Sequence, residues 1–329
     1  MSEYKGIKGF QVQTRTEDPS PTEVQTGDFY YNSATGQFKT INSGGAPIGS
    51  WSSAGSLNTN RAYSGGSGIA TAGVIFGGYT GSAYAANTET YNGTAFSNAT
   101  VMNSGRGALG YAGATQTDGL AISGVNPYVT NTEKWNGTGW TETGDVAVAR
   151  NAGSGAGTTT AAIYFGGNHP PSSTKVDYTE SFNGSSWSEV AELNTAKGQM
   201  AGSGTATAAY AIGGYSNTNL ATVEEWNGTG WTETTDINTA RRSLGGSSGS
   251  GTVTSTLIFG GYASPAQVAN TESWNGSTWT EISDMASARS DFAGTGTPVS
   301  ALASGGEPSY SATEQWSAAD LQIKTVTTS

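Results

Sequence analysis

A segment centred on a glutamate recurs six times along the 329 residues of the chain. An aromatic residue and usually Asn-Gly follow the glutamate, and successive copies are 44, 47, 44, 48 and 42 residues apart. A period of roughly 20 to 50 residues is typical of proteins that stack one small unit many times. The six glutamates are Glu89, Glu133, Glu180, Glu224, Glu272 and Glu314.

Two further positions keep a fixed distance from the glutamate. A bulky apolar residue follows it by seven positions, and a cation follows that residue by ten. Trp51 and Arg61 have the same spacing of ten, so the chain enters the repeat partway through a unit. The apolar residues are Phe96, Trp140, Trp187, Trp231, Trp279 and Leu321. The cations are Arg106, Arg150, Lys197, Arg241 and Arg289.

Each unit has the pattern of four short strands. The first is nearly all Gly, Ala, Ser and Thr, as in AGSGAGTT after Arg150, and the second is an apolar run ending in Gly-Gly, as at Gly78. The third carries the glutamate, and the fourth begins at the bulky apolar residue. Asn-Gly between the last two, as at Asn136, favours a two-residue hairpin turn.

The Gly-Gly run, the later aromatic residue and the Trp that follows it resemble the kelch repeat, over about residues 50–321. The resemblance implies an all-β fold, namely a six-bladed kelch-like β-propeller over residues 46–329. The composition agrees, because 49 Gly and only 12% charged residues suit short strands joined by tight turns. Small first strands would fit where six blades crowd around one axis.

The ring can be closed in two ways. Residues 51–57 can complete the sixth unit as its outer strand, which joins the two chain ends without a covalent bond. Alternatively, residues 321–326 can form that strand and leave Trp51 at an edge. The first arrangement is favoured, because Trp51 and Leu57 match the apolar positions of the other units.

Residues 1–45 lie outside the repeat and hold a Pro-containing linker and the hairpin sequence GDFYYNSATGQFKTI. This arrangement resembles the leading segments of tailed-bacteriophage virion proteins, especially fibre and appendage components. An isolated hairpin is marginal in water, so the segment should pack against the propeller or another chain. We expect Phe29, Tyr30, Tyr31 and Phe38 to dock it on other virion proteins.

Charge and composition exclude several partners. A net charge of −11 with 14 Lys and Arg leaves no basic patch for nucleic acid. No apolar run could cross a bilayer, and the start of the chain lacks the apolar stretch of a signal peptide, so we expect neither membrane insertion nor conventional export. Without Cys, the chain has no disulfides and no thiol chemistry. The expected location is the virion, after synthesis in the host cytoplasm.

Catalytic chemistry is disfavoured. His169 is the sole histidine, and neither a Ca²⁺-loop motif nor a cofactor motif is present, so we expect no metal and no cofactor. The repeated arginines and glutamates favour structural pairing, because a buried carboxylate without a partner is costly. The alternative is a sialidase-like or depolymerising glycan enzyme. Its candidate acids are Asp145, Asp177, Asp236, Asp284 and Asp291.

The loop between the second and third strands varies most in length, so one face should carry the variable surface. Tyr84, Tyr128, His169 and Tyr310 occur there, either as a glycan- or protein-binding surface or as packing residues. For the tyrosines that directly follow Gly-Gly, packing is favoured. These are Tyr79, Tyr215 and Tyr262.

The sequence therefore favours a non-enzymatic virion structural protein, such as a tail fibre, appendage or decoration. Its propeller would bind protein or host-surface polysaccharide, and several copies would assemble on the particle as a homo-oligomer.

Overall fold

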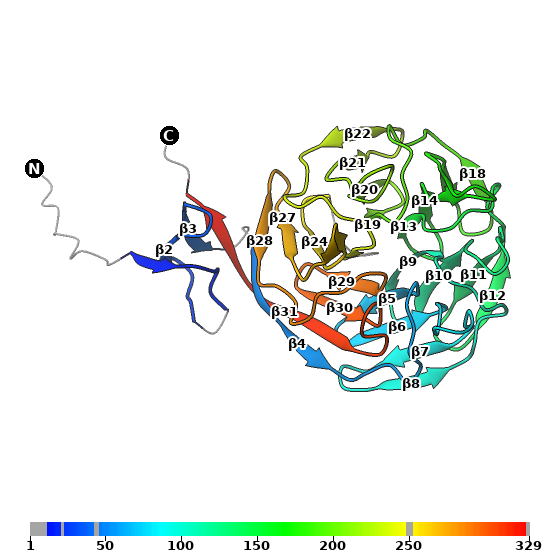
Figure 1. The fold of residues 1–329 in the computed structure, drawn as a ribbon, viewed down its shortest axis with the longest axis horizontal. Coiled ribbons are helices and arrows are strands. Elements are labelled where there is room, and N and C mark those ends of the chain that lie inside the picture. Colours follow the sequence, from blue (N-terminus) through cyan, green and yellow to red (C-terminus); the bar gives the residue numbers. More distant parts are fainter. Residues whose placement is uncertain (1–11, 21–22, 43–45, 248–252, 327–329) are drawn as a thin grey trace, which may run out of the picture.

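The computed structural model describes residues 12–20, 23–42, 46–247 and 253–326. Every regular element among them is a β-strand, which confirms the all-β class. Five four-stranded antiparallel sheets follow one another along the chain, and one seven-stranded sheet joins its two ends (Figure 1). We number the four-stranded sheets 1 to 5 in chain order and call the larger one sheet 6.

In sheets 1 to 5 the spatial order of the strands is the chain order. Sheet 1 consists of β5 (Gly65–Ile69), β6 (Ala72–Phe76), β7 (Thr88–Tyr91) and β8 (Phe96–Ala99), and sheet 2 of β9 (Gly110–Thr115), β10 (Asp118–Ile122), β11 (Thr132–Trp135) and β12 (Trp140–Thr143). Sheet 3 consists of β13 (Ser154–Gly157), β14 (Ala162–Phe165), β17 (Thr179–Phe182) and β18 (Trp187–Glu189), and sheet 4 of β19 (Ala201–Thr205), β20 (Ala208–Ile212), β21 (Val223–Trp226) and β22 (Trp231–Thr234). Sheet 5 consists of β23 (Gly245–Gly246), β24 (Thr256–Phe259), β27 (Thr271–Trp274) and β28 (Trp279–Ile282).

Sheet 6 combines residues from both ends of the chain. Its long strand β31 pairs with β30 on one side and with β4 and β3 on the other. β3 also pairs with β2, and β2 pairs with β1. Trp51 in β4 is the register partner of Trp316 in β31, so β4 is the outer strand that the sequence favoured, although it covers Ala46–Ala54 and not residues 51–57. Leu321 lies within β31, so the alternative in which it begins a separate outer strand is wrong. The strands are β29 (Ala293–Thr297), β30 (Ser300–Ser304), β31 (Thr313–Thr325), β4 (Ala46–Ala54), β3 (Gln37–Asn42), β2 (Phe29–Asn32) and β1 (Gln13–Arg15).

The sheets surround a common centre in a propeller-like arrangement, with their first strands innermost (Figure 1). Each first strand lies beside the next one, in the circular order β5, β9, β13, β19, β23, β29 and back to β5. These strands approach so closely that small residues are required. A Cβ added at Gly202 would lie 2.5 Å from the carbonyl oxygen of Gly155 in the neighbouring sheet.

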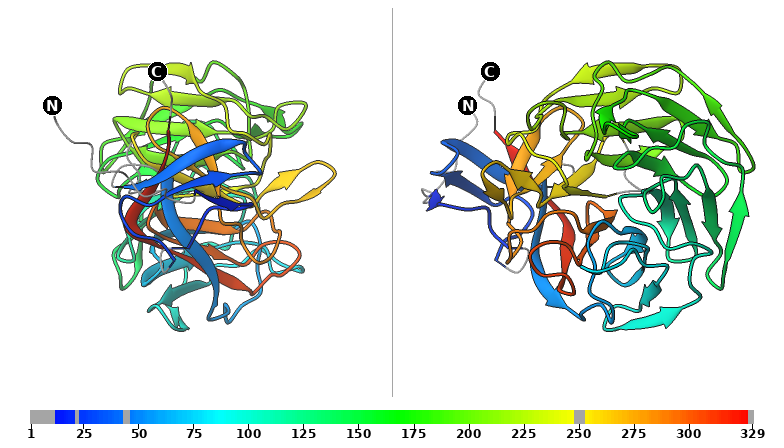
Figure 2. Two further views of the ribbon diagram at one scale, coloured as in Figure 1. Left: turned by 90° about the vertical axis from the view of Figure 1, so that its left-hand side faces the viewer. Right: turned by 45° about the vertical axis from the view of Figure 1, so that its right-hand side comes forward.

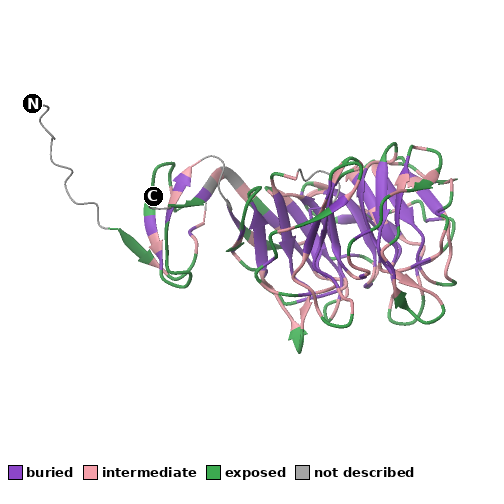
Figure 3. Ribbon diagram, turned by 90° about the horizontal axis from the view of Figure 1, so that it is seen from above, coloured by how far each residue is buried: buried purple, intermediate pink, exposed green. Residues whose placement is uncertain are grey.

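Two short hairpins extend the loops between second and third strands. They are β15 (Asn168–His169) with β16 (Thr174–Lys175) in sheet 3, and β25 (Tyr262–Ala263) with β26 (Ala266–Gln267) in sheet 5. The hairpin of sheet 5 projects clearly from the body of the molecule (Figure 2). The buried residues lie mainly in the strands, whereas the loops are more exposed (Figure 3).

In sheets 2 to 6 the repeated Trp links the sheet to the one before it. Trp140 packs against Phe76 with ring centroids 4.8 Å apart, and its Nε1 donates a hydrogen bond of 2.9 Å to Thr88 Oγ1. Trp187, Trp231 and Trp51 make the same bond to Thr132, Thr179 and Thr271, at 3.0–3.1 Å. The bond from Trp51 links sheet 6 to sheet 5, so β4 holds the place of a fourth strand.

Two interfaces lack this bond. Between sheets 4 and 5, Trp279 Nε1 donates instead to the carbonyl oxygen of Thr235 at 3.1 Å. Between sheets 6 and 1 the donor itself is missing. Phe96 stands where the other units have Trp and has no donor, and Thr313 Oγ1 is buried without a hydrogen-bond partner. Ser304 occupies the position that Phe76 holds in sheet 1, so the interface also has a smaller side chain at the packing site.

Replacing Phe96 by Trp is expected to raise the free energy of unfolding by about 1 kcal/mol, because the indole can donate to Thr313 beside the small Ser304. The matched variant Trp140→Phe, which leaves Thr88 without its donor, should lower stability by about as much. Urea unfolding of both variants measures these changes. A destabilised Phe96→Trp protein would mean that the site has no room for an indole.

Candidate functional site

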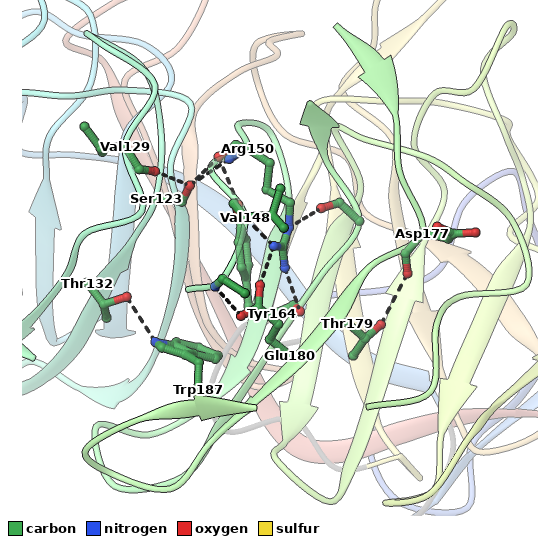
Figure 4. Close-up of polar contacts among 12 residues, drawn as sticks. Ser123, Val129, Thr132, Val148, Arg150, Tyr164, Asp177, Thr179, Glu180 and Trp187 are labelled. Carbon is green, nitrogen blue, oxygen red and sulfur yellow. Dashed lines mark hydrogen bonds and ion pairs between the residues drawn. The ribbon is translucent and has the colours of Figure 1, made fainter. Parts of the chain in front are cut away.

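The repeated cations and glutamates form buried ion pairs, as the sequence predicted. Arg150 Nη1 lies 2.5 Å from Glu180 Oε1, and Arg150 also donates to the carbonyl oxygens of Val148, Tyr164 and Gly166 (Figure 4). The other pairs have separations of 2.6–3.1 Å, and all twelve side chains are at most 4% exposed. They are Arg61–Glu89, Arg106–Glu133, Lys197–Glu224, Arg241–Glu272 and Arg289–Glu314.

Each glutamate also receives backbone hydrogen bonds from the loop before its cation. Glu89, for example, accepts from the N–H groups of Asn58 and Thr59 at 2.7 and 3.1 Å. Burial lowers the pKa of Arg61 to about 10, which the charge of Glu89 opposes. Because these charges are shielded and already paired, they are not available to a ligand.

The second residue after each cation belongs to a closed ring of backbone hydrogen bonds. At each of these six positions the N–H donates to the carbonyl oxygen of the equivalent residue in the preceding unit, at 2.6–3.1 Å. Tyr63 donates to Asp291, which closes the circle. All six residues have a positive φ of 47–58°, a conformation that is unfavourable for a residue with a Cβ. They are Tyr63, Ala108, Ala152, Gln199, Ser243 and Asp291.

The side chains of this ring are not symmetric, unlike the buried ion pairs. Ala108 and Ala152 occupy one side, and Tyr63, Gln199, Ser243 and Asp291 occupy the other. The ring could not be predicted from the sequence, because its six residues have no shared chemistry. Their only signal is the constant distance from the cation.

Two carboxylates, Asp291 and Glu307, lie near two tyrosines, Tyr63 and Tyr310. Tyr63 Oη donates to Glu307 Oε1 at 3.3 Å, and Ser290 Oγ donates to Asp291 Oδ2 at 2.9 Å. Burial raises the pKa of Asp291, and Glu307 adds to this effect. Burial and the neighbouring Glu307 likewise raise the pKa of Tyr310. Asp291 is therefore protonated at a higher pH than an exposed aspartate would be.

Three of the four tyrosine and histidine candidates lie in linked loops. Tyr84 is 5.1 Å from Tyr79 between ring centroids, and burial, Tyr79 and Tyr128 raise its pKa. Tyr310 is electrostatically coupled to Tyr79 as well. His169 lies apart from them, in β15 opposite Thr174.

The tyrosines that follow Gly-Gly have mixed roles. Tyr79 and Tyr262 donate their hydroxyls to carbonyl oxygens of their own loops, at Gly81 and Pro265, and so help to shape these loops. Tyr215 instead stacks on Arg242, with 4.7 Å between the guanidinium carbon and the ring centroid. Arg242 also stacks on Tyr262 at 4.5 Å.

Of the acids named for an enzymatic alternative, Asp291 is the one that belongs to the ring. Asp145 accepts a hydrogen bond from Thr130 Oγ1 at 3.1 Å, and Asp284 accepts one from the N–H of Thr271 at 3.2 Å. Both therefore take part in loop structure.

The four aromatic residues of the N-terminal segment divide between its two faces. Phe29 and Phe38 are 43% and 46% exposed and stack with centroids 5.5 Å apart, and Tyr31 packs 5.1 Å from Phe38. Tyr30 is buried and donates its hydroxyl to Asp18 at 2.8 Å. Asp18 also forms a buried ion pair with Lys39 at 2.9 Å. Tyr30 is thus an interior residue, and of the four expected docking residues only the other three have side chains at the surface.

One surface cleft lies away from the ring. It has a volume of about 690 Å³ and lies between the N-terminal hairpin and the end of sheet 5, with Gln37, Trp279 and Ile323 in its walls. It therefore marks the junction of the two parts of the chain.

No protein-family model matches the chain, and a search of curated proteins finds no match either. Among the described residues, none forms a helix that is long and apolar enough to span a membrane.

Proposed function

We propose that residues 46–329 form a six-bladed kelch-like β-propeller, and that the protein is a non-enzymatic component of a tailed-bacteriophage virion. In this proposal the propeller presents a binding surface for protein or host-surface polysaccharide. One observation carries the binding role: the six equivalent ring positions hold five different residue types, while the buried pairs around them barely vary.

This contrast distinguishes scaffold from surface. A position that only maintains the fold has the same task in every unit, so its residue type repeats, as in the Arg–Glu pairs. Positions that contact an asymmetric partner have no such constraint. The ring and its flanking loops supply tyrosines, amides and a few charges, which suit recognition of sugars or proteins.

The virion assignment depends on the leading segment and its resemblance to fibre and appendage proteins. Phe29, Tyr31 and Phe38 form an exposed apolar patch at the far end of sheet 6. Such a patch is costly in a free protein and suits contact with another chain. We propose that it docks the protein on neighbouring virion proteins, in several copies.

The double variant Phe29→Ser and Phe38→Ser is expected to fold normally but to be absent from particles, because both side chains are exposed and serve only the contact. Gold-labelled antibody against the propeller should decorate wild-type particles and miss those made with the variant. Val101→Ser, which alters a 54% exposed apolar residue of the propeller, is the matched control and should leave incorporation unchanged. Labelling of host cells in place of particles would overturn the virion assignment.

A second candidate function is glycan hydrolysis, favoured by Asp291 with its raised pKa beside Glu307. Paired carboxyl groups are the machinery of many glycosidases. Measuring reducing ends released from host polysaccharide decides between the two. Release that disappears in Asp291→Asn would establish the enzyme, and the non-enzymatic proposal expects none from the wild-type protein.

A further inference from the structure

Four cations among the described residues have no carboxylate within 4.0 Å, and two of them share one tyrosine. Lys175 Nζ lies 5.4 Å from the ring centroid of Tyr215, and Arg242 lies 4.7 Å from the same centroid. The other two, Lys134 and Lys324, belong to different sheets. Two unpaired positive charges are thus held together on a chain whose net charge is −11.

Loops from three consecutive units build this cluster. Lys175 ends β16 of sheet 3, Tyr215 and Asn219 lie between β20 and β21 of sheet 4, and Tyr262 begins β25 of sheet 5. Arg242 precedes β23 and exchanges two backbone hydrogen bonds with Tyr262, at 2.8 and 3.1 Å. The cluster therefore lies on the variable face and has no counterpart in sheets 1, 2 and 6, where the residues equivalent to Arg242 are Ala62, Gly107 and Ser290.

The guanidinium of Arg242 is oriented but not saturated. Its central carbon lies over the rings of Tyr215 and Tyr262, and Nη1 donates to Asn219 Oδ1 at 2.9 Å. Asn219 is itself held by a hydrogen bond of 2.9 Å to the carbonyl oxygen of Tyr262. Within the described residues, Nε and Nη2 of Arg242 donate to no group, and the side chain is partly exposed. A planar fork with two free donors matches a carboxylate.

The electrostatics favour an anion at this place. Burial and the neighbouring Arg242 lower the pKa of Lys175, which means that the two positive charges repel each other. The charge of Arg242 acts to lower the pKa of Asp291, against the larger effect of burial, but the two side chains form no ion pair. A bound carboxylate would relieve the repulsion, and the adjoining tyrosine and asparagine side chains would contact the sugar that carries it.

We propose that Lys175 and Arg242, with Tyr215, Asn219 and Tyr262, form a binding site for acidic saccharide units, in which the carboxylate of the sugar lies between the two cations. This inference rests on the proposed glycan-binding role and specifies its ligand class. A uronic acid and a sialic acid both provide such a carboxylate. The surrounding negative charge of the protein disfavours long polyanions such as nucleic acid.

Calorimetric titration of the full chain with three probes tests the site: hexagalacturonate, sialyllactose and neutral maltohexaose. Binding of one of the two acidic probes is expected, and it distinguishes the two sources of the carboxylate. Arg242→Gln should weaken that binding at least about tenfold, because a charge-assisted hydrogen-bonded pair is lost. Lys175→Gln should weaken it less, because Lys175 contributes a point charge without a fork.

Lys134→Gln is the matched control, because Lys134 also faces an aromatic ring, at 5.9 Å from the centroid of Phe182. It removes the same charge elsewhere and should change binding less than twofold. An equal loss in Lys134→Gln would reduce the effect to net charge and overturn the site. The site is also overturned if neither acidic probe binds, or if both Lys175→Gln and a folded Arg242→Gln bind like the wild type. If maltohexaose binds to the wild type and to all variants while neither acidic probe binds, this inference fails and the proposed glycan-binding function stands.

Discussion

Replacing Arg150 by alanine is expected to lower the free energy of unfolding by about 3 to 5 kcal/mol, because it leaves the buried carboxylate of Glu180 without its cation. Three carbonyl oxygens also lose a donor. Glu133→Ala should have a comparable effect in sheet 2, where Arg106 would lose its carboxylate. Urea unfolding followed by Trp fluorescence measures both losses.

The control for this prediction comes from the repeat itself. Lys197 occupies the position of Arg150 in another unit and pairs with Glu224 at 3.1 Å. Arg150→Lys should therefore keep the ion pair and lose less than half as much stability as Arg150→Ala. If Arg150→Ala and Glu133→Ala both unfold at the wild-type urea concentration, the ion pairs do not support the fold.

A disulfide between Ser50→Cys and Ser317→Cys is expected to give the largest gain in stability. These two exposed residues are register partners in β4 and β31, which join the two ends of the propeller-like body without a covalent bond. Partner Cα atoms in antiparallel strands are close enough for the bond. Closing a loop of about 267 residues should add roughly 5 kcal/mol in the chain-entropy model.

Thr90→Cys with Ser97→Cys provides the comparison, since these residues are register partners within one hairpin of sheet 1. That bond closes about eight residues and should add only roughly 2 kcal/mol. The chain has no cysteine of its own, so neither pair can bond wrongly. Thermal unfolding with and without reductant measures the gains. If the oxidised Ser50–Ser317 variant melts at the same temperature as its reduced form, β4 does not close the propeller-like body.

The repeat predicted the scaffold well, because its invariant residues make local contacts that recur in each unit. The spacing of Trp140 from Glu133 places the two on adjacent strands of one hairpin, and the Asn-Gly turn sets their register. The position of Trp51 followed from the same spacing. What the period could not indicate is that one strand, β31, is long enough to pair with both β4 and β3.

The candidate site was much less predictable. The positive φ at Tyr63 and Asp291 arises from hydrogen bonds between units far apart in the chain, and neither residue type prefers that conformation. Arg242 follows Arg241 directly, so one of two adjacent cations is buried and the other stacks on the surface, a division that only the loop geometry sets. Tyr30 was expected to dock with Phe29, Tyr31 and Phe38, but it is buried and donates its hydroxyl to Asp18 of the linker.

The path of β4 and β31 has a mechanical consequence. The two strands lie antiparallel and side by side, and they connect the N-terminal segment with the propeller-like body (Figure 1). A pull on that segment therefore acts along the strand axes and loads the hydrogen bonds of the ladder in shear, all at the same time. Peeling from one end would instead break them one after another at low force. Trp316 and Trp51, packed 5.8 Å apart within the loaded region, would have to slide past each other before the ring could open.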